Sequence, residues 1–194
     1  MIEANSVDVV TTRSVLIYVQ AKQQAFDECY RALKPNGRLS IFEPINRFAP
    51  HMFGGYDLTP ISDIAHKIRA VYERIQPLET DPMLNFDERD LLTFAEKAGF
   101  TEAHLDLQVE IVPGKYEHES RSEEPNWETF VRSSGNPLIP PIEEAMNQVL
   151  TPDEAEQFVA YLRPLFEAKR YVRRFAAAYL WAVKHEDTES ESKP

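Results

Sequence analysis

The sequence has 194 residues, of which 43% are hydrophobic and 27% are charged, a composition typical of one soluble globular domain. Its formal net charge of −11 argues against non-specific nucleic-acid binding, because that mode needs Lys and Arg to neutralise phosphates. No apolar run reaches the roughly 20 residues of a membrane span, no signal-peptide pattern is present, and the single cysteine, Cys29, excludes an internal disulfide framework. We therefore expect a cytoplasmic protein without a nucleic-acid or membrane partner.

The first 44 residues predict a strand, a helix and a second strand. Residues 6–12 are rich in β-branched side chains and lack polar alternation, which predicts a strand buried on both faces. Residues 13–19 are expected to form a loop or a short helix. Apolar residues recur at helical spacing over 21–33, and the run Lys34-Pro35-Asn36-Gly37 predicts the end of that helix. Residues 38–42 are then the second strand, and the unit indicates an α/β fold.

The middle of the chain predicts helices interrupted by loops. Residues 45–84 contain several prolines and one expected helix at 61–74. Residues 87–98 have helical apolar spacing and are followed by Gly99, a typical helix stop, and residues 101–112 predict a third strand. Between this strand and the next helices, a polar loop is expected at 115–126.

The last third of the chain predicts more helices and a final strand. Helices are expected at 127–133 and 142–149. The clearest helix start is Thr151, since Pro152 takes the first helical position and Glu154 completes a capping-box pattern. Pro164 is expected to kink or divide this helix. The remaining expectations are a buried strand at 176–184 and a disordered tail at 186–194.

Several of these segments together carry a family resemblance. Asp8-Val9-Val10, then Val15-Leu16-Ile17-Tyr18-Val19, then the run from Tyr30 to Leu39 (YRALKPNGRL) follow one another at a characteristic spacing. They resemble the middle of class I S-adenosylmethionine-dependent methyltransferases, in which a strand, a "vl.yv" turn and a helix ending in "R.LkPgG.l" lead into the next strand. Ala98-Gly99-Phe100 and the run AYLWAVK at 178–184 resemble the approach to the sixth strand and the seventh strand of that fold.

The resemblance implies a single partial domain with a Rossmann-like sheet whose strands are equivalent to 4-5-7-6. Its core would comprise residues 6–44, 85–112 and 175–185. Insertions at 45–84 and 113–174 would form a mostly helical lid. The resemblance also implies S-adenosylmethionine as cofactor and a small-molecule methyl acceptor.

Two elements of the family pattern have no counterpart. None of the six glycines lies in a Gly-x-Gly loop between a strand and a helix, and the acidic residue that holds the cofactor ribose is also missing. In the family order, residues 6–12 would form an exposed sheet edge. The sequence therefore predicts an N-terminally truncated methyltransferase. The alternative is a catalytically inactive module that binds a partner, or its own copy as a homodimer, through that edge.

The resemblance places Thr12, Arg13, Ser14 and Val15 beside the cofactor. Plain strand propensity also explains Thr12. Arg13 is expected to need a partner, because it is a charge at the tip of a buried strand. Glu43 ends the next strand at the same crevice, where it could bind the substrate and orient or deprotonate the methyl acceptor. It could equally be a polar residue where the chain leaves the core.

The predicted lid offers further candidates. Tyr56 is expected to contact the substrate, although packing within the lid explains it equally well. The same alternatives apply to the other lid aromatics, Phe48, Phe53, Tyr72, Trp127 and Phe130. A basic cluster at Arg163, Lys169, Arg170, Arg173 and Arg174 is a solvated helix face or the rim of an anion site. The five histidines show no metal-ligand spacing with Cys or carboxylates, so no metal is expected.

Overall fold

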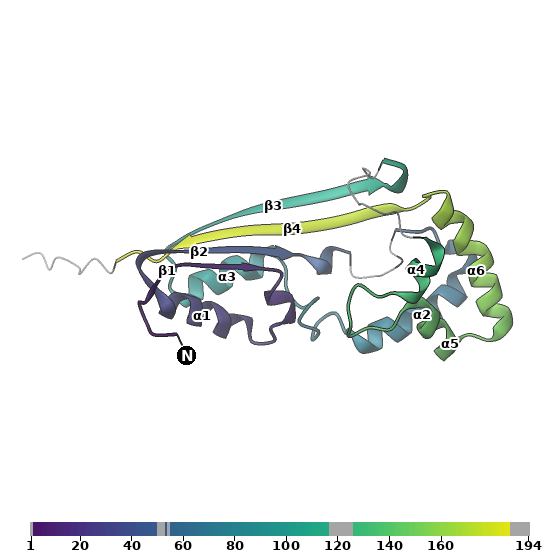
Figure 1. The fold of residues 1–194 in the computed structure, drawn as a ribbon, viewed down its shortest axis with the longest axis horizontal. Coiled ribbons are helices and arrows are strands. Elements are labelled where there is room, and N and C mark those ends of the chain that lie inside the picture. Colours follow the sequence, from purple (N-terminus) through teal and green to yellow (C-terminus); the bar gives the residue numbers. More distant parts are fainter. Residues whose placement is uncertain (1, 50–52, 54, 117–125, 187–194) are drawn as a thin grey trace, which may run out of the picture. The chain divides into compact units, whose positions relative to one another are not determined.

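The computed structural model describes residues 2–49, 53, 55–116 and 126–186 (Figure 1). Their contacts divide into two compact units. The first, here called the sheet unit, contains residues 1–48, 81–109 and 175–194. The second, the helical unit, contains residues 49–80 and 110–174. In the described residues, no helix is both long enough and apolar enough to cross a membrane.

The sheet unit is built on a four-stranded mixed sheet. The strands β1 (Val7–Arg13) and β2 (Leu33–Pro44) are parallel, and β4 (Val172–Val183) runs antiparallel to β2. The strand β3 (Glu102–Pro113) follows β4, which makes the order β1-β2-β4-β3 with β1 at an edge. This is the predicted order, in which the last described strand lies between β2 and β3 and runs antiparallel to β2. The fold is therefore α/β with an open sheet, as the sequence predicts.

Two helices cover one face of this sheet, namely α1 (Lys22–Ala32) and α3 (Glu88–Ala98), as Figure 1 shows. The rings of Phe26 in α1 and Phe94 in α3 lie 5.7 Å apart. Beneath them the inward side chains of the sheet are buried, among them Leu33, Leu39, Ile41 and Leu180.

The opposite face of the sheet carries exposed side chains. Val9 is 59% exposed, and Tyr179 and Trp181 are 42% and 40% exposed. The prediction that the first strand is buried on both faces is therefore wrong. A run of β-branched residues reports strand propensity, but burial on the second face also needs a covering layer, and the described residues of the sheet unit place helices on one side only.

The run Lys34–Gly37 lies inside β2, which begins at Leu33 rather than at Arg38 as predicted. Val7 pairs with Leu33 and Val9 pairs with Arg38, so the register shifts within this run. Asn36 has the left-handed φ of +64°. Its N–H donates to the carbonyl of Lys184 at 2.7 Å. The turn residues thus form a bulge whose backbone bonds to the end of β4.

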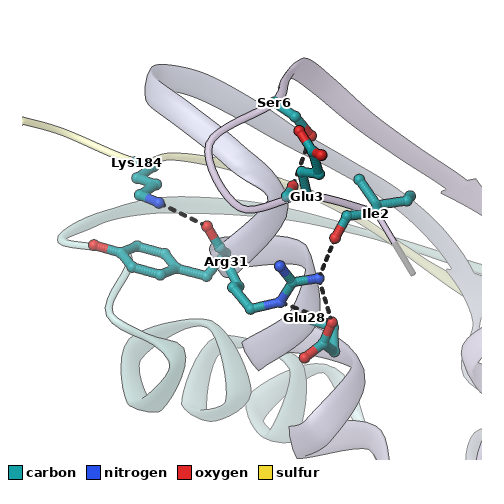
Figure 2. Close-up of polar contacts among 7 residues, drawn as sticks. Ile2, Glu3, Ser6, Glu28, Arg31 and Lys184 are labelled. Carbon is teal, nitrogen blue, oxygen red and sulfur yellow. Dashed lines mark hydrogen bonds and ion pairs between the residues drawn. The ribbon is translucent and has the colours of Figure 1, made fainter.

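The ammonium group of Lys184 caps the C-terminal end of α1. Its Nζ donates to the carbonyls of Tyr30 and Leu33, both at 2.9 Å, and to Oδ1 of Asn5 at 2.8 Å. It also lies 4.5 Å from the centre of the Tyr30 ring. The last carbonyls of a helix have no partner within the helix, so a cation at this position stabilises them (Figure 2).

The segment before β1 is also attached to α1. Figure 2 shows Arg31 donating to the carbonyl of Ile2, at 2.7 Å, and pairing with Glu28, at 2.9 Å. Within the segment, the hydroxyl of Ser6 donates to the carbonyl of Glu3 at 2.6 Å. These contacts fix the chain where it enters the sheet.

In its described residues, the helical unit contains the α-helices α2 (Ser62–Ile75), α4 (Trp127–Arg132), α5 (Ile142–Val149) and α6 (Pro152–Glu167). Phe53 is fully buried at its centre, with ring centroids 6.0 Å from Tyr72 and 5.8 Å from Phe158. Short 3-10 helices occur in both units. The sheet unit contains η1 (Leu16–Tyr18) and η2 (Asn46–Phe48), and the helical unit contains η3 (Thr59–Ile61) and η4 (Gly114–Tyr116). Among the predicted lid aromatics, Phe53, Tyr72 and Trp127 lie in the hydrophobic core of the helical unit.

Local capping signals define the ends of α3 and α6. The side chain of Asp87 accepts from the first-turn amides of α3, and Gly99 ends the helix with φ of +107°. Thr151 and Glu154 form the predicted capping box at α6. Pro164 does not divide α6, which continues to Glu167.

The strand β4 begins at Val172, four positions before the predicted Ala176. The predicted disordered tail, 186–194, lies outside the described residues except for Glu186, which accepts a hydrogen bond from Asn36 at 3.2 Å. Most of the predicted loop at 115–126 also lies outside them.

Candidate functional site

The candidate site lies where the parallel strands β1 and β2 end. Thr12 is paired with Ile41 and Arg13 with Phe42, so both strands end at the same edge of the sheet. The N–H of Ser14 donates to the carbonyl of Phe42 at 2.9 Å and is the last link between the strands. Ser14 has φ of +53°, in the left-handed region that non-glycine residues seldom adopt. The chain therefore leaves β1 through a sharp bend.

The bend directs successive backbone N–H groups toward the side chain of Glu43. Oε1 of Glu43 accepts from Val15 at 2.9 Å and from Leu16 at 3.0 Å, and Oε2 accepts from Ile17 at 3.3 Å. A left-handed residue followed by a right-handed one forms a concave nest of amides that attracts anions. Glu43 fills this nest and is fully buried. Both of its oxygens are therefore engaged within the protein.

A buried lysine lies at the other end of the same segment. Lys22, the first residue of α1, is only 4% exposed. Its Nζ donates to the carbonyls of Val19 at 2.9 Å and Pro82 at 2.8 Å, and to Oδ1 of Asn85 at 2.8 Å. Burial lowers the pKa of Lys22, while the negative charge of Glu43 acts in the opposite direction. The three acceptors and the nearby carboxylate account for a cation buried at this place.

Thr12 and Arg13 lie on opposite faces at the tip of β1. The Oγ1 of Thr12 is buried and has no hydrogen-bond partner among the described residues. The guanidinium of Arg13 lies 4.9 Å from the centre of the Phe42 ring, which in turn packs edge-on against Tyr179 at 5.0 Å. Arg13 therefore has an aromatic contact on the exposed face of the sheet.

Tyr56 belongs to the helical unit. Its ring packs against Phe130 and Tyr171, at centroid distances of 6.1 and 5.4 Å. Its predicted contact with a substrate stays a prediction. In the basic cluster, Arg163 pairs with Glu167 on α6. Arg173 and Arg174 lie in β4, so the prediction that the whole cluster is one helix face is wrong.

The five residues predicted from the sequence at this edge are thus brought together: Thr12, Arg13, Ser14, Val15 and Glu43 all lie at the ends of β1 and β2. Sequence reasoning missed Lys22, Leu16 and Ile17. A lysine at the start of an amphipathic helix resembles any solvated lysine, and the other two act through backbone amides, which every residue except proline has. In the described residues, no group of three or more His, Cys, Asp or Glu side chains is placed to hold a metal ion.

This arrangement offers a ligand two kinds of contact. A crevice at the C-terminal ends of parallel strands is the usual ligand position in open α/β sheets. The hydroxyl of Thr12 lies at that position as a buried group that has no hydrogen-bond partner among the described residues. The segment from Ser14 to Val19 provides a backbone surface whose N–H groups already have acceptors within the protein. The N–H of Ser14 donates to the carbonyl of Phe42, the next three donate to Glu43, and the last two donate to carbonyls of the segment itself.

Comparison with known proteins assigns the first segment of the chain. Residues 1–41 match the family model described as "Methyltransferase domain". These residues comprise β1, α1 and most of β2, together with the segment between β1 and α1. The resemblance to methyltransferases is therefore confirmed for this part of the chain. A search of curated protein sequences finds no significant match.

Solved structures similar to the chain include methyltransferases. The YcgJ protein of Bacillus subtilis aligns with a TM-score of 0.45 at 10% identity over 95% of this chain. Phosphoethanolamine N-methyltransferase 2 of Haemonchus contortus, in complex with phosphomonomethylethanolamine and S-adenosylhomocysteine, aligns at 0.39 and 16% over 96%. An arsenic(III) S-adenosylmethionine methyltransferase of Chlamydomonas reinhardtii aligns at 0.40 and 15% over 96%. The chain covers 66%, 35% and 40% of these three proteins, and TM-scores below 0.5 establish neither its fold nor its function.

Proposed function

We propose that this chain takes part in S-adenosylmethionine-dependent methyl transfer to a small molecule. The observation that carries the proposal is the position of the methyltransferase-domain match, residues 1–41. This match includes the segment that follows β1 at the C-terminal ends of the parallel strands, where a ligand of an open α/β sheet binds.

The cofactor-binding residues that we propose are Thr12, Arg13, Ser14 and Val15. The buried hydroxyl of Thr12, which lacks a partner among the described residues, fits a ligand with a hydrogen-bonding group. The N–H of Val15 is committed to Glu43, so Val15 would contact the cofactor through its side chain, which is 45% exposed. S-adenosylmethionine supplies the methyl group when bound. Transfer to a good nucleophile needs mainly proximity and alignment, and these residues would provide them.

The lid that the sequence predicts at residues 45–84 and 113–174 is proposed to shape the substrate side of the site, with Tyr56 among its substrate contacts. Lids of this kind exclude water and enclose small acceptors. Glu43 was proposed as a second substrate contact, but three backbone N–H groups occupy its oxygens. Its geometry favours a positioning role, which is developed in the next subsection. The cytoplasmic location also stays a prediction.

Calorimetric titration of the chain with S-adenosylmethionine and S-adenosylhomocysteine tests the proposal, with circular dichroism confirming a folded sample. We expect micromolar binding that Thr12→Val weakens about tenfold, because a hydroxyl that hydrogen-bonds a ligand is replaced by a methyl group of similar size. Thr11→Val is the matched control, since the neighbouring threonine is exposed on the other face of β1. A folded chain that binds neither compound would contradict cofactor binding by the chain alone.

A second candidate function rests on the free edge of the sheet. None of the described strands pairs with the outer side of β1, and Val9 on that strand is 59% exposed. The charged pair of Asp8 with Lys34, at 3.0 Å, lies close to this edge. An open strand of this composition accepts another strand readily. The alternative is therefore an inactive module that binds a partner, or a second copy as a homodimer, through β1. A truncated methyltransferase would also have an unpaired edge at this strand.

The mass of the chain in solution tests this alternative. Light scattering over a range of concentrations should show a dimer that Val9→Lys dissociates, because a lysine on an edge strand opposes pairing. Leu138→Lys is a control at an exposed apolar position in the helical unit. A monomer at every concentration would count against the homodimer.

A further inference from the structure

We infer that Glu43 and Lys22 are positioning residues that hold the segment Val15–Val19 by its two ends. The inference rests on the proposed function only for the ligand that this segment meets. Glu43 belongs to β2 and Lys22 to α1, and both side chains are buried in the sheet unit. The segment between them leaves the strand tip and contains the 3-10 helix η1, Leu16–Tyr18.

At its start, the segment has N–H groups that the short helix leaves without a partner. The first N–H groups of any helix point away from its body and need an external acceptor. Here the carboxylate of Glu43 takes three of them, from Val15, Leu16 and Ile17. The residue at the N-cap position, Val15, has no side chain that could cap the helix. The segment therefore depends on a residue from the neighbouring strand, 26 to 28 positions away in sequence.

At its end, the segment needs hydrogen-bond donors rather than acceptors. The carbonyl groups that end a helix need a donor, and the carbonyl of Val19 receives the ammonium of Lys22 at 2.9 Å. The same ammonium binds the carbonyl of Pro82 and the side chain of Asn85. The Nζ atom of Lys22 also lies 4.7 Å from the centre of the Phe86 ring. Lys22 thus ties the end of the segment to the chain that precedes α3.

The two side chains also act on each other. A buried carboxylate and a buried ammonium at opposite ends of one short segment each reduce the cost of burying the other charge, and the charge of Glu43 favours the protonated form of Lys22. The signs also match the dipole of the segment, with the anion at its N–H end and the cation at its carbonyl end. Both groups would therefore set the shape of the segment without touching the ligand.

Hydrogen exchange measured by NMR on the 194-residue chain tests this inference. Glu43→Gln should speed exchange of the Val15, Leu16 and Ile17 amides at least about tenfold, because a neutral amide replaces a charged acceptor. Amides in the centre of β2 and β4 should change much less, which a general loss of stability would not produce. Glu28→Gln is the matched control, since Glu28 is an exposed partner of Arg31.

Lys22→Met provides an independent test if Glu43→Gln does not fold. It should speed exchange of the Tyr18 and Val19 amides, which belong to the end of η1, and Lys34→Met, at an exposed lysine, is its control. The inference is overturned if the amides of the segment exchange as in the unchanged chain, or if they accelerate only in step with those of β2 and β4.

Titration with S-adenosylhomocysteine separates this inference from the proposed function. If the unchanged chain binds this compound, Glu43→Gln should weaken binding at least about tenfold while the β2 and β4 amides stay protected. Equal binding by both proteins would overturn the positioning role. If the unchanged chain does not bind, cofactor binding by the chain alone fails, and the exchange rates still decide whether Glu43 and Lys22 hold the segment.

Discussion

The hydroxyl group of Tyr72 gives a prediction whose size follows from the structure. Tyr72 lies on α2 in the core of the helical unit, and its hydroxyl is buried without a hydrogen-bond partner among the described residues. Burial, with a smaller contribution from Glu144, raises the pKa of Tyr72 to about 12 from the ordinary 10. Between these two values the unfolded chain loses the phenolic proton while the folded chain keeps it. Stability therefore falls as the pH rises from 10 to 12.

The change in stability can be estimated from this difference in pKa. One pKa unit corresponds to about 1.4 kcal/mol, so the raised pKa removes about 1.4 kcal/mol of unfolding free energy by pH 11 and on the order of 3 kcal/mol above pH 12. Tyr72→Phe should abolish this part of the alkaline loss. At neutral pH the same variant should be as stable as the unchanged chain, or more stable by about 1 kcal/mol, because it removes a buried hydroxyl without a partner.

Urea unfolding followed by circular dichroism at pH 8, 10 and 11 provides the assay. Tyr116→Phe is the control, because the side chain of Tyr116 is 63% exposed. An alkaline loss in Tyr72→Phe equal to that of the unchanged chain would refute the reasoning. So would a loss of more than about 1 kcal/mol at pH 8, since it would show that the hydroxyl has a stabilising partner.

Three further predictions concern the sheet unit and one loop. Gly99→Ala should cost about 1–2 kcal/mol in thermal unfolding, because φ is +107° and a Cβ would lie 3.1 Å from the Tyr30 ring; Gly135→Ala, with open space around it, should change stability by less than about 0.5 kcal/mol. Lys184→Met should lower the urea-unfolding free energy by about 1–2 kcal/mol, because it removes the cation at the end of α1. Hydrogen bonds from two histidines lower the pKa of Glu102, so the stability it confers is lost as pH falls through that lowered value. Glu102→Gln should therefore lose less stability between about pH 5 and pH 3 than the unchanged chain, measured by the same method.

Local signals in the sequence predicted the helix ends that depend on nearby residues. Asp87 and Gly99 define α3, and Thr151 with Glu154 defines the start of α6, because each capping group acts on a backbone within one turn. The run Lys34–Gly37 was predicted as a turn because its residues favour one. Its backbone instead bonds to Lys184, far along the chain, and no local pattern reports such a bond.

The candidate site shows the same division between local signals, which the sequence reports, and contacts between distant residues, which it does not. The family resemblance placed Thr12 to Val15 and Glu43 at one edge of the sheet, and the strand register brings them there. It did not identify what Glu43 binds, because the partners are backbone amides. It did not identify Lys22, because the burial of that side chain depends on acceptors at Pro82 and Asn85, about 60 positions later.

The position of β4 in the sheet has a consequence for the order of folding. It is the last of the described strands, yet it lies between β2 and β3 and pairs Arg38 with Val183. Of the four described strands, only the parallel pair of β1 and β2 can take its place in the sheet before β4 has been synthesised. Pairing between such distant residues slows folding, because a long loop must close before the contacts form. During synthesis the edge of β2 would therefore stay unpaired until β4 is available. An unpaired strand edge promotes aggregation, so the nascent chain needs protection during this interval.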